Sequence, residues 1–303
     1  MKISVVMATY NGEKYLEQQI KSILGQTLKP DEFIVCDDSS TDGTINILEK
    51  YRQLSQLIYV VNPSQLGVIN NFVKAVSLAA PGNYISLADQ DDEWMPEKLE
   101  KSIQRLKEID DAAIPCMVYS DLMLVDRDEK LLNASFWNEV GQQEKYRHNL
   151  QTLLFGQFVN GCTTILNPAL RQMFKNIPDK VRFHHDDWIA VAAFAFGKVA
   201  SIKEPLVKYR KHDNNVTIKT NTKPRNRYRT LTEQLFKVIR GKDDFLSIRF
   251  ELARLFYKQY APAMTAEVKQ CFEKFMALEG RSYFAKKIAF RRVVKKFQIE
   301  KLV

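Results

Sequence analysis

Three clusters of acidic residues in this 303-residue chain have types and spacings that could do chemistry. A carboxylate can accept the proton of an attacking hydroxyl group, and neighbouring carboxylates can hold a hard divalent cation. Each cluster follows an apolar stretch or begins a predicted helix, where a side chain can be held in place and still face a ligand. The clusters are Asp37-Asp38, Asp89-Gln90-Asp91-Asp92 and Asp186-Asp187.

The cluster at 89–92 is the most informative because several carboxylates crowd one turn, and each makes the ionisation of the others less favourable. A bound Mg²⁺ or Mn²⁺ relieves that repulsion, and such sites commonly combine one or two carboxylates with substrate phosphates. We therefore expect a ligand that carries phosphate. For Asp37 and Asp38, capping of the following helix is an equally good explanation.

Other familiar nucleotide sites and nucleophiles are absent from the sequence. The turn Thr9–Glu13 is not a GxGxxG motif, and the chain contains neither a GxxxxGK[ST] loop nor a GxSxG elbow. The four cysteines form no CxxC pair, which argues against a zinc knuckle or a redox motif, and we interpret Cys36 and Cys162 as core residues. A metal, rather than a glycine-rich loop, is thus expected to hold the phosphates.

The elements that must position these clusters alternate between strand and helix up to about residue 120. The predicted strands are Ile3–Ala8, Glu32–Cys36, Leu57–Val61, Tyr84–Ala88 and Met117–Ser120. The predicted helices are Lys14–Leu24, Thr44–Leu54, Val68–Ala79 and Pro96–Ile109. This alternation predicts an α/β fold whose mostly parallel sheet is covered on both faces. Ligands of such sheets bind beyond the carboxyl ends of the strands.

The later part of the chain is less regular. We expect strands at Cys162–Leu166, Lys198–Ile202 and Leu206–Tyr209, and a helix at about Asp186–Phe196. A polar linker, Thr220–Arg229, then leads to three or four amphipathic helices. We place a domain boundary near residue 222, with a catalytic domain at 1–222 and a basic helical region at 223–303.

The net charge of +9 is concentrated in that last region. Residues 223–303 hold 20 Lys and Arg against 8 Asp and Glu, whereas the preceding residues hold 25 against 28. Such asymmetry marks either a surface that contacts phosphates or a solvated helical face. The segment Phe284–Phe297 is basic and amphipathic, which is typical of helices at anionic membranes; packing on the catalytic domain is the alternative. No apolar run approaches the roughly 18–20 residues that span a bilayer.

The order of the motifs resembles that of a known enzyme family. The motifs are Ser4–Leu16, Ser22–Thr27, Asp37–Thr44, Asn62–Val68, Asp89–Leu99, His185–Trp188 and Tyr209–Val216. Together they resemble family 2 inverting glycosyltransferases with the GT-A (nucleotide-diphospho-sugar transferase) fold, and the last two resemble the bacterial rhamnosyltransferase-like branch. The resemblance covers about residues 1–218 and implies a nucleotide-sugar half at 1–121, an acceptor half at 122–222 and a C-terminal helical extension.

The resemblance also implies a role for individual residues. Asp186 matches the catalytic general base, and Asp89-Gln90-Asp91 matches the DXD motif. The implied nucleotide-sugar contacts are Thr9, Tyr10, Glu13, Asp38 and Asp89; the implied metal contacts are Asp91 and His212; the implied acceptor contacts are Trp188 and Asp187.

One position departs from the branch pattern, because Asp187 stands where an aromatic residue often follows the base. Adjacent helical residues point about 100° apart, so only one of Asp186 and Asp187 can face a cleft. Alignment through His185 and Gly197 favours Asp186. For Trp188, burial within the helix packing is as good an interpretation as stacking on an acceptor sugar.

The function implied by the resemblance is inverting, metal-dependent glycosyl transfer with Mg²⁺ or Mn²⁺. The donor would be a nucleotide-diphosphate sugar, with dTDP-L-rhamnose favoured by the branch, and the acceptor a hydroxyl of a growing, lipid-linked bacterial surface polysaccharide. Transfer of galactose, glucose or N-acetylhexosamine is the main alternative. A sugar nucleotidyltransferase would need a glycine-rich basic loop at Thr9–Glu13. A nucleic-acid-binding protein would carry recognition motifs that are missing here, so no nucleic-acid partner is expected. We expect a cytoplasmic enzyme, held peripherally at the inner face of the plasma membrane.

Overall fold

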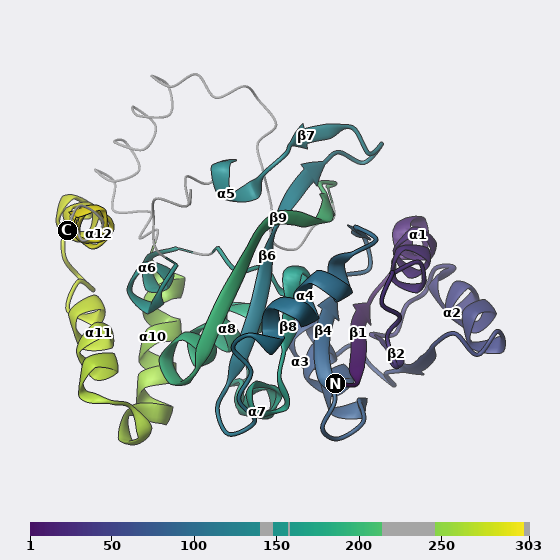
Figure 1. The fold of residues 1–303 in the computed structure, drawn as a ribbon, viewed down its shortest axis with the longest axis horizontal. Coiled ribbons are helices and arrows are strands. Elements are labelled where there is room, and N and C mark those ends of the chain that lie inside the picture. The colour runs from purple at the N-terminus through teal and green to yellow at the C-terminus, as the bar shows by residue number, and fades with distance from the viewer. Residues whose placement is uncertain (140–147, 157, 214–245, 300–303) are drawn as a thin grey trace. The chain divides into compact units, whose positions relative to one another are not determined.

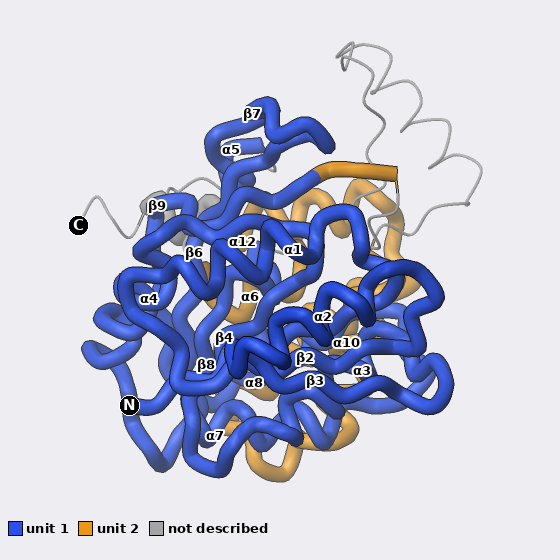
Figure 2. Tube along the Cα trace, turned by 90° about the vertical axis from the view of Figure 1, so that its right-hand side faces the viewer, with its two compact units in different colours: residues 1–143, 158–210 blue, residues 144–157, 211–303 orange. Residues whose placement is uncertain are grey.

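The computed structural model describes residues 1–139, 148–156, 158–213 and 246–299, and their side chains up to residue 293. Figure 2 shows two compact units, residues 1–143 with 158–210 and residues 144–157 with 211–303. The boundary that we expect at residue 222 and the linker Thr220–Arg229 lie outside the described residues. The second unit also includes residues 144–157, which are distant from the tail in sequence.

A nine-stranded sheet forms the centre of the first unit (Figure 1). Its strands are β1 (Ile3–Thr9), β2 (Glu32–Asp37), β3 (Ile58–Val61), β4 (Tyr84–Ala88), β5 (Glu93–Trp94), β6 (Cys116–Val125), β7 (Leu131–Asn133), β8 (Thr164–Leu166) and β9 (Lys198–Arg210). The order is β3-β2-β1-β4-β8-β6-β9-β5, with β7 paired to β6. β3, β2, β1 and β4 pair in parallel, as do β6 and β9, whereas β8 is antiparallel to both its neighbours. The sheet is therefore mostly parallel, as predicted.

Helices cover both faces of this sheet. The helical segments of the first unit are α1 (Glu13–Leu24), α2 (Thr44–Gln53), α3 (Gly67–Leu78), α4 (Lys98–Lys107), α5 (Phe136–Glu139), η1 (Gly161–Thr163), α7 (Pro168–Arg171), η2 (Gln172–Asn176) and α8 (His185–Phe196). In Figure 1, α4 lies in front of the sheet and α3 and α8 lie behind it. Gln26, just after α1, bonds the backbone around the start of α4. Arg171 of α7 bonds the carbonyl groups of Val76 and Ala79 at the end of α3.

Burial explains why the first strand and helix form where the sequence predicts them. Val5, Val6 and Met7 are fully buried, as expected for a parallel strand covered on both faces. The buried positions of α1 recur at helical spacing, with Leu16 and Ile20 on its inner face. The parallel register sets Thr9 opposite Asp37, which brings the carboxyl ends of these strands to one edge.

The structure differs from the predicted elements around β6, β8 and β9. β9 is continuous over residues 198–210, where the sequence predicts two strands. Pro205 pairs opposite Asp121 at a shift in register, and because proline has no N–H to donate, this irregularity makes one strand look like two in sequence. The strand predicted at Cys162–Leu166 begins instead with η1, so that β8 starts at Thr164.

The second unit is helical and has an aromatic core. Its described helices are α6 (Leu150–Phe155), α10 (Ser247–Tyr260), η3 (Ala261–Ala263), α11 (Ala266–Met276) and α12 (Tyr283–Ile299). The ring of Phe275 lies 4.8 Å from that of Phe250 and 5.0 Å from that of Phe155, between ring centroids. These helices confirm the predicted C-terminal extension. None of the described helices combines the length and the apolar character that crossing a bilayer requires.

Candidate active site

The carboxyl ends of β1 and β2 form a hydrogen-bonded edge. The Thr9 hydroxyl donates to Asp37 over 2.9 Å, and Asp37 also accepts the backbone N–H of Ser40 over 2.8 Å. Thr9 and Asp37 are both buried. Asp37 therefore holds the loop after β2 together, and Thr9 is part of that support.

Asp38 shapes the start of α3. One of its carboxylate oxygens accepts the side-chain amide of Asn62 and the N–H of Leu66, and the other accepts the N–H of Gly67, at 2.7–2.9 Å. An ionised carboxylate has about four acceptor positions, so these three donors leave room for one more. The residue expected to bind the nucleoside base is thus also the anchor of the neighbouring loop.

Tyr10 and Gln90 tie the end of β1 to the acidic turn. The Tyr10 N–H donates to Oε1 of Gln90 over 2.9 Å, and Nε2 of Gln90 donates to the Tyr10 carbonyl over 3.0 Å. The Tyr10 side chain is 45% exposed and so is available to a ligand. Glu13, also exposed, accepts the backbone N–H of Gly43 over 3.0 Å. Tyr10 and Glu13 consequently line an open edge of the sheet.

The acidic turn after β4 concentrates negative charge. Burial, together with the negative charges of Asp91 and Asp186, raises the pKa of Asp89 to about 7. Burial and the charges of Asp91 and Asp89 raise the pKa of Asp92 well above its usual value. Asp186 accepts the N–H of Gly161, and the next residue, Cys162, lies against Asp89, so α8 brings its carboxylate near this turn although nearly a hundred residues separate the two aspartates in sequence.

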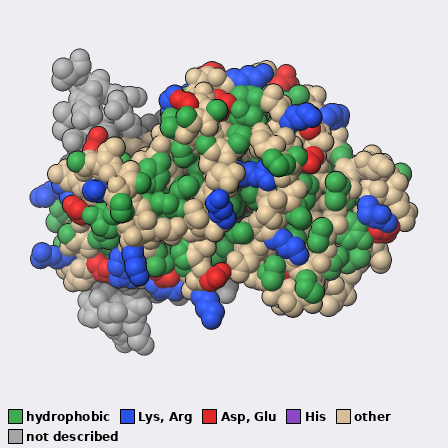
Figure 3. Space-filling view, turned by 90° about the horizontal axis from the view of Figure 1, so that it is seen from below, with side chains coloured by type: hydrophobic (Ala, Val, Ile, Leu, Met, Phe, Trp, Pro, Cys, Tyr) green, Lys and Arg blue, Asp and Glu red, His purple; other side chains and the backbone are tan. Residues whose placement is uncertain are grey.

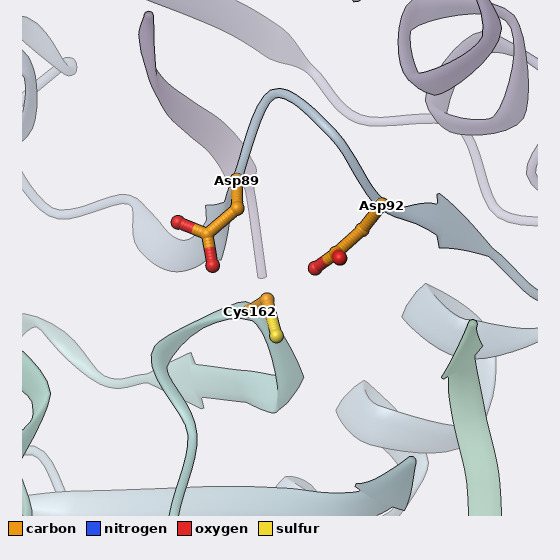
Figure 4. Close-up of side chains that lie close together, drawn as sticks. All are labelled: Asp89, Asp92 and Cys162. Carbon is orange, nitrogen blue, oxygen red and sulfur yellow. The ribbon is translucent and has the colours of Figure 1, made fainter. Parts of the chain in front are cut away.

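Cys162 lies against the same turn, although the sequence indicates only a core residue. One donor atom from each of Cys162, Asp89 and Asp92 lies within 4.8 Å of the others, and Figure 4 shows the three residues together. Burial and the charges of Asp92 and Asp89 raise the pKa of the Cys162 thiol well above its usual value. The thiol is therefore protonated at neutral pH in this environment.

Two basic residues support the turn from inside. Arg210, only 2% exposed, donates from Nε to the Asp91 carbonyl over 3.1 Å and from its backbone N–H to Asp92 over 3.3 Å. The buried Lys98 donates to the Ser86 hydroxyl over 3.0 Å, and burial lowers its pKa to about 7. Arg210 thus bonds the backbone of the turn at Asp91 and the carboxylate of Asp92.

Asp186 and Asp187 have different surroundings at the start of α8. Asp187 is buried and its carboxylate accepts the backbone N–H of His184 over 3.1 Å, which makes it part of the helix cap. Asp186 is half-buried and accepts the N–H groups of Gly161 and Asp187 over 3.0 and 2.9 Å. A Cβ at Gly161 would lie 3.1 Å from Nε2 of the neighbouring His185, a tight contact that glycine avoids.

The remaining predicted residues are Trp188 and His212. Trp188 has no exposed surface, and its ring stacks on Phe183 with 5.8 Å between centroids. This burial favours the interpretation of Trp188 as a core aromatic. His212 follows β9 and belongs to the second compact unit.

The donor set of the acidic turn fits a hard divalent cation. Asp89, Asp91 and Asp92 supply only carboxylate oxygens, which Mg²⁺ and Mn²⁺ prefer. Burial and, after it, repulsion by neighbouring carboxylates raise the pKa values of Asp89 and Asp92. A cation of charge +2 would remove that repulsion.

Several residues of the site carry no recognisable signal in the sequence. Gln90 occupies the variable position of the Asp-x-Asp motif. Only its hydrogen bonds to the Tyr10 backbone show that it links the end of β1 to the acidic turn. Gly161 and Cys162 come from a segment whose sequence indicates a turn and a strand. Arg210 lies in the motif Tyr209–Val216, but its position in that motif does not indicate a contact with Asp91.

The comparisons with known proteins agree with this geometry. The family model described as "Glycosyl transferase family 2" matches residues 4–173. An uncharacterized glycosyltransferase of Nostoc sp. is 28% identical over 225 residues, covering 71% of this chain and 66% of that protein. The dTDP-rhamnosyl transferase RfbG of Shigella flexneri is 27% identical over 235 residues, covering 69% of this chain and 72% of that protein. The matched part of this chain thus spans about two thirds of the length of these relatives.

Two solved structures share the fold. S. aureus TarS 1–349 in complex with UDP has a TM-score of 0.60 at 18% identity and covers 92% of this chain and 71% of that chain. The mannosyltransferase PcManGT from Pyrobaculum calidifontis, in complex with GDP-Man and Mn²⁺, has a TM-score of 0.50 at 16% identity and covers 99% of this chain and 87% of that chain. These likenesses confirm the expected GT-A fold.

Proposed function

The chain belongs to glycosyl transferase family 2, and on that premise we propose that it transfers a sugar from a nucleotide-diphosphate sugar to a hydroxyl group with inversion. The observation that carries the proposal is the convergence of Asp186, from α8, with Asp89 and Asp91, from the turn after β4. A general base and a phosphate-binding turn then face one another, as inverting transfer requires.

In the proposed reaction the acceptor oxygen attacks the anomeric carbon of the donor sugar. The hydroxyl proton passes to Asp186, the new C–O bond forms, and the bond to the phosphate oxygen breaks with its electron pair on the leaving nucleoside diphosphate. Asp186 is held for this by the N–H groups of Gly161 and Asp187. Asp187 keeps its place in the helix cap, which supports Asp186 as the base.

We propose that the donor lies along the edge formed by Thr9, Tyr10, Glu13, Asp38 and Asp89. Asp38 retains one acceptor position for the base, and the exposed Tyr10 ring is available to the nucleoside. A divalent cation held by Asp91 would neutralise the charge that develops on the leaving diphosphate. The assignment of His212 as a further contact rests on the resemblance of Tyr209–Val216 alone.

The donor sugar is proposed to be rhamnose carried by dTDP, with a hexose donor as the alternative. Similarity to the dTDP-rhamnosyl transferase RfbG supports the first, and the UDP and GDP-Man complexes of the neighbours support the second. The test is a panel of dTDP-, UDP- and GDP-sugars assayed for release of nucleoside diphosphate with Mg²⁺ or Mn²⁺. We expect turnover of one donor that stops with EDTA. Absence of turnover for every donor would refute the proposed activity.

We further propose that α12 docks the enzyme on an anionic membrane that carries a lipid-linked glycan acceptor. Phe284 is 61% exposed and Ile288 is 50% exposed, one helical turn apart, and the exposed Arg281, Arg291 and Arg292 flank them. The other side of α12 is used for packing, since Phe290 lies 5.6 Å from Phe155 between ring centroids. On the face shown in Figure 3, by contrast, Lys and Arg are interspersed with acidic and apolar side chains.

The docking proposal is tested with vesicles of anionic and of neutral lipid. Wild-type protein should sediment with the anionic vesicles, and the double variant Phe284→Ser/Ile288→Ser should stay in the supernatant. The matched control is Leu131→Ser/Leu132→Ser, which removes two similarly exposed apolar side chains from β7, 54% and 49% exposed. Equal sedimentation of the wild type and the α12 variant would refute docking through this helix.

A further inference from the structure

The thiol and carboxylates of Cys162, Asp89 and Asp92 form a cluster of mixed donor type behind the acidic turn. Asp89 and Asp92 flank that turn, and Cys162 comes from η1, about seventy residues later in the chain. One donor atom from each lies within 4.8 Å of the other two, and Figure 4 shows Cys162 lying between and below the two aspartates. This arrangement resembles the donor set of a metal site.

Asp92 supplies a second and independent indication that the cluster accepts a ligand. It has no exposed surface, and its Oδ1 accepts the backbone N–H of Arg210 over 3.3 Å. Among the residues that the structure describes, its Oδ2 has no hydrogen-bond partner, and the carboxylate is directed toward Cys162 in Figure 4. A buried acceptor left without a partner is unfavourable, more so when it is charged, and a cation would satisfy it.

We propose that Asp89, Asp92 and Cys162 bind a thiophilic divalent cation such as Zn²⁺ or Cd²⁺. Thiolate sulfur is a preferred ligand of these ions, whereas Mg²⁺ and Mn²⁺ prefer oxygen. This donor set shares Asp89 and Asp92 with the acidic turn, but it has the sulfur of Cys162 in place of the carboxylate of Asp91. On binding, the Cys162 thiol releases its proton to solvent as the sulfur–metal bond forms.

The dimensions and charges of the cluster suit such an ion. Metal–ligand distances of about 2.0–2.3 Å place tetrahedral donors roughly 3.5 Å apart, so donors within 4.8 Å need to close only slightly. Asp89 is half-buried, which leaves an entry path on its side, while Cys162 and Asp92 are buried. The positive charge of Lys98 acts on Asp92 and Cys162, but two carboxylates and a thiolate outweigh it.

The experiment is a titration of the full chain with Cd²⁺, followed by the ultraviolet charge-transfer absorption of a cadmium–thiolate bond. This absorption does not depend on the transferase activity. Absence of the band would therefore count against the metal site alone and not against the proposed transferase function. We expect a saturable band in the wild type that excess Mg²⁺ does not remove. The band should vanish in Cys162→Ser, and the apparent affinity should fall at least about tenfold in Asp92→Asn.

Cys271→Ser is the matched control, because it removes a half-buried cysteine of the second unit and should leave the band unchanged. A wild type without the band, or a band that persists in Cys162→Ser, overturns the proposal. Should Cys162→Ser fail to fold, X-ray absorption of the cadmium-bound wild type decides the matter. One sulfur ligand together with oxygen ligands supports the site, and any other sulfur count contradicts it.

Discussion

Arg210 holds the backbone of Asp91 across 119 residues of sequence, with Nε donating to the Asp91 carbonyl over 3.1 Å. The same guanidinium donates to the Gln18 side chain over 2.9 Å and lies 4.8 Å from the centroid of the Tyr15 ring. α1, the acidic turn and the end of β9 therefore meet at one buried cation. Arg210 therefore positions the turn that is proposed to bind the metal.

Replacing Arg210 should consequently loosen the turn. In Arg210→Lys the planar group that bonds Asp91 and Gln18 is lost while the positive charge remains. We expect the apparent affinity for Mg²⁺ or Mn²⁺, measured by nucleotide-sugar turnover, to fall about 10–100-fold. The control is Lys101→Met, which breaks an exposed ion pair with Glu204 and should change little. An Arg210→Lys enzyme with wild-type metal affinity would show that the acidic turn keeps its conformation without the guanidinium group of Arg210.

Gln90 should matter for donor binding although it is the variable position of its motif. Gln90→Ala removes both bonds to the Tyr10 backbone and frees the end of β1 from the acidic turn. We expect the KM for the nucleotide sugar to rise about tenfold, since each such bond contributes about 1 kcal/mol. Gln104→Ala, on an exposed turn of α4, is the control. An unchanged KM in Gln90→Ala would argue against a role in donor binding for the two hydrogen bonds between Gln90 and the Tyr10 backbone.

The stability of the protein should depend on the protonation of His185. Burial lowers the pKa of His185 from 6.5 to about 3, so the folded state keeps it neutral where the unfolded chain binds a proton. The free energy of unfolding that depends on neutral His185 is therefore fully present above about pH 6.5, and it is lost as the pH falls toward 3. The upper limit that this shift sets on the loss of unfolding free energy is about 5 kcal/mol.

We expect His185→Leu to lose less free energy of unfolding than the wild type between pH 7 and pH 4. Urea unfolding at a series of pH values measures the difference between the two slopes. Parallel slopes for the two proteins would mean that His185 is protonated in the folded state, contrary to its burial against Phe72.

The sequence predicts the architecture well because its signals are local. The apolar run of β1 and the helical spacing of α1 are each readable within a dozen residues, and burial at Val5 and Leu16 follows them. Pro205 shows the limit, since a proline in the middle of β9 looks like the end of a strand. Only the pairing of β9 with β6 reveals that the strand continues.

The candidate site is predictable only in part because its contacts join distant segments. The motifs identify Asp89, Asp91 and the pair Asp186 and Asp187, and alignment through His185 and Gly197 favours Asp186 but gives no physical reason that separates the two. That distinction comes from the bond between Asp187 and the His184 N–H. Cys162 could not be placed at the acidic turn by any local pattern, because a buried cysteine has the same sequence signal wherever it packs.

The most direct test of the proposed mechanism compares sugar transfer and donor binding in Asp186→Asn. Asparagine keeps the shape of the side chain and can still accept the Gly161 N–H, but it cannot take a proton. We predict that transfer falls by about 10²–10⁴-fold, while the Kd for the nucleotide sugar, measured by calorimetry, stays within about twofold. An Asp186→Asn enzyme that transfers sugar at the wild-type rate would contradict the account and move the role of base to Asp187.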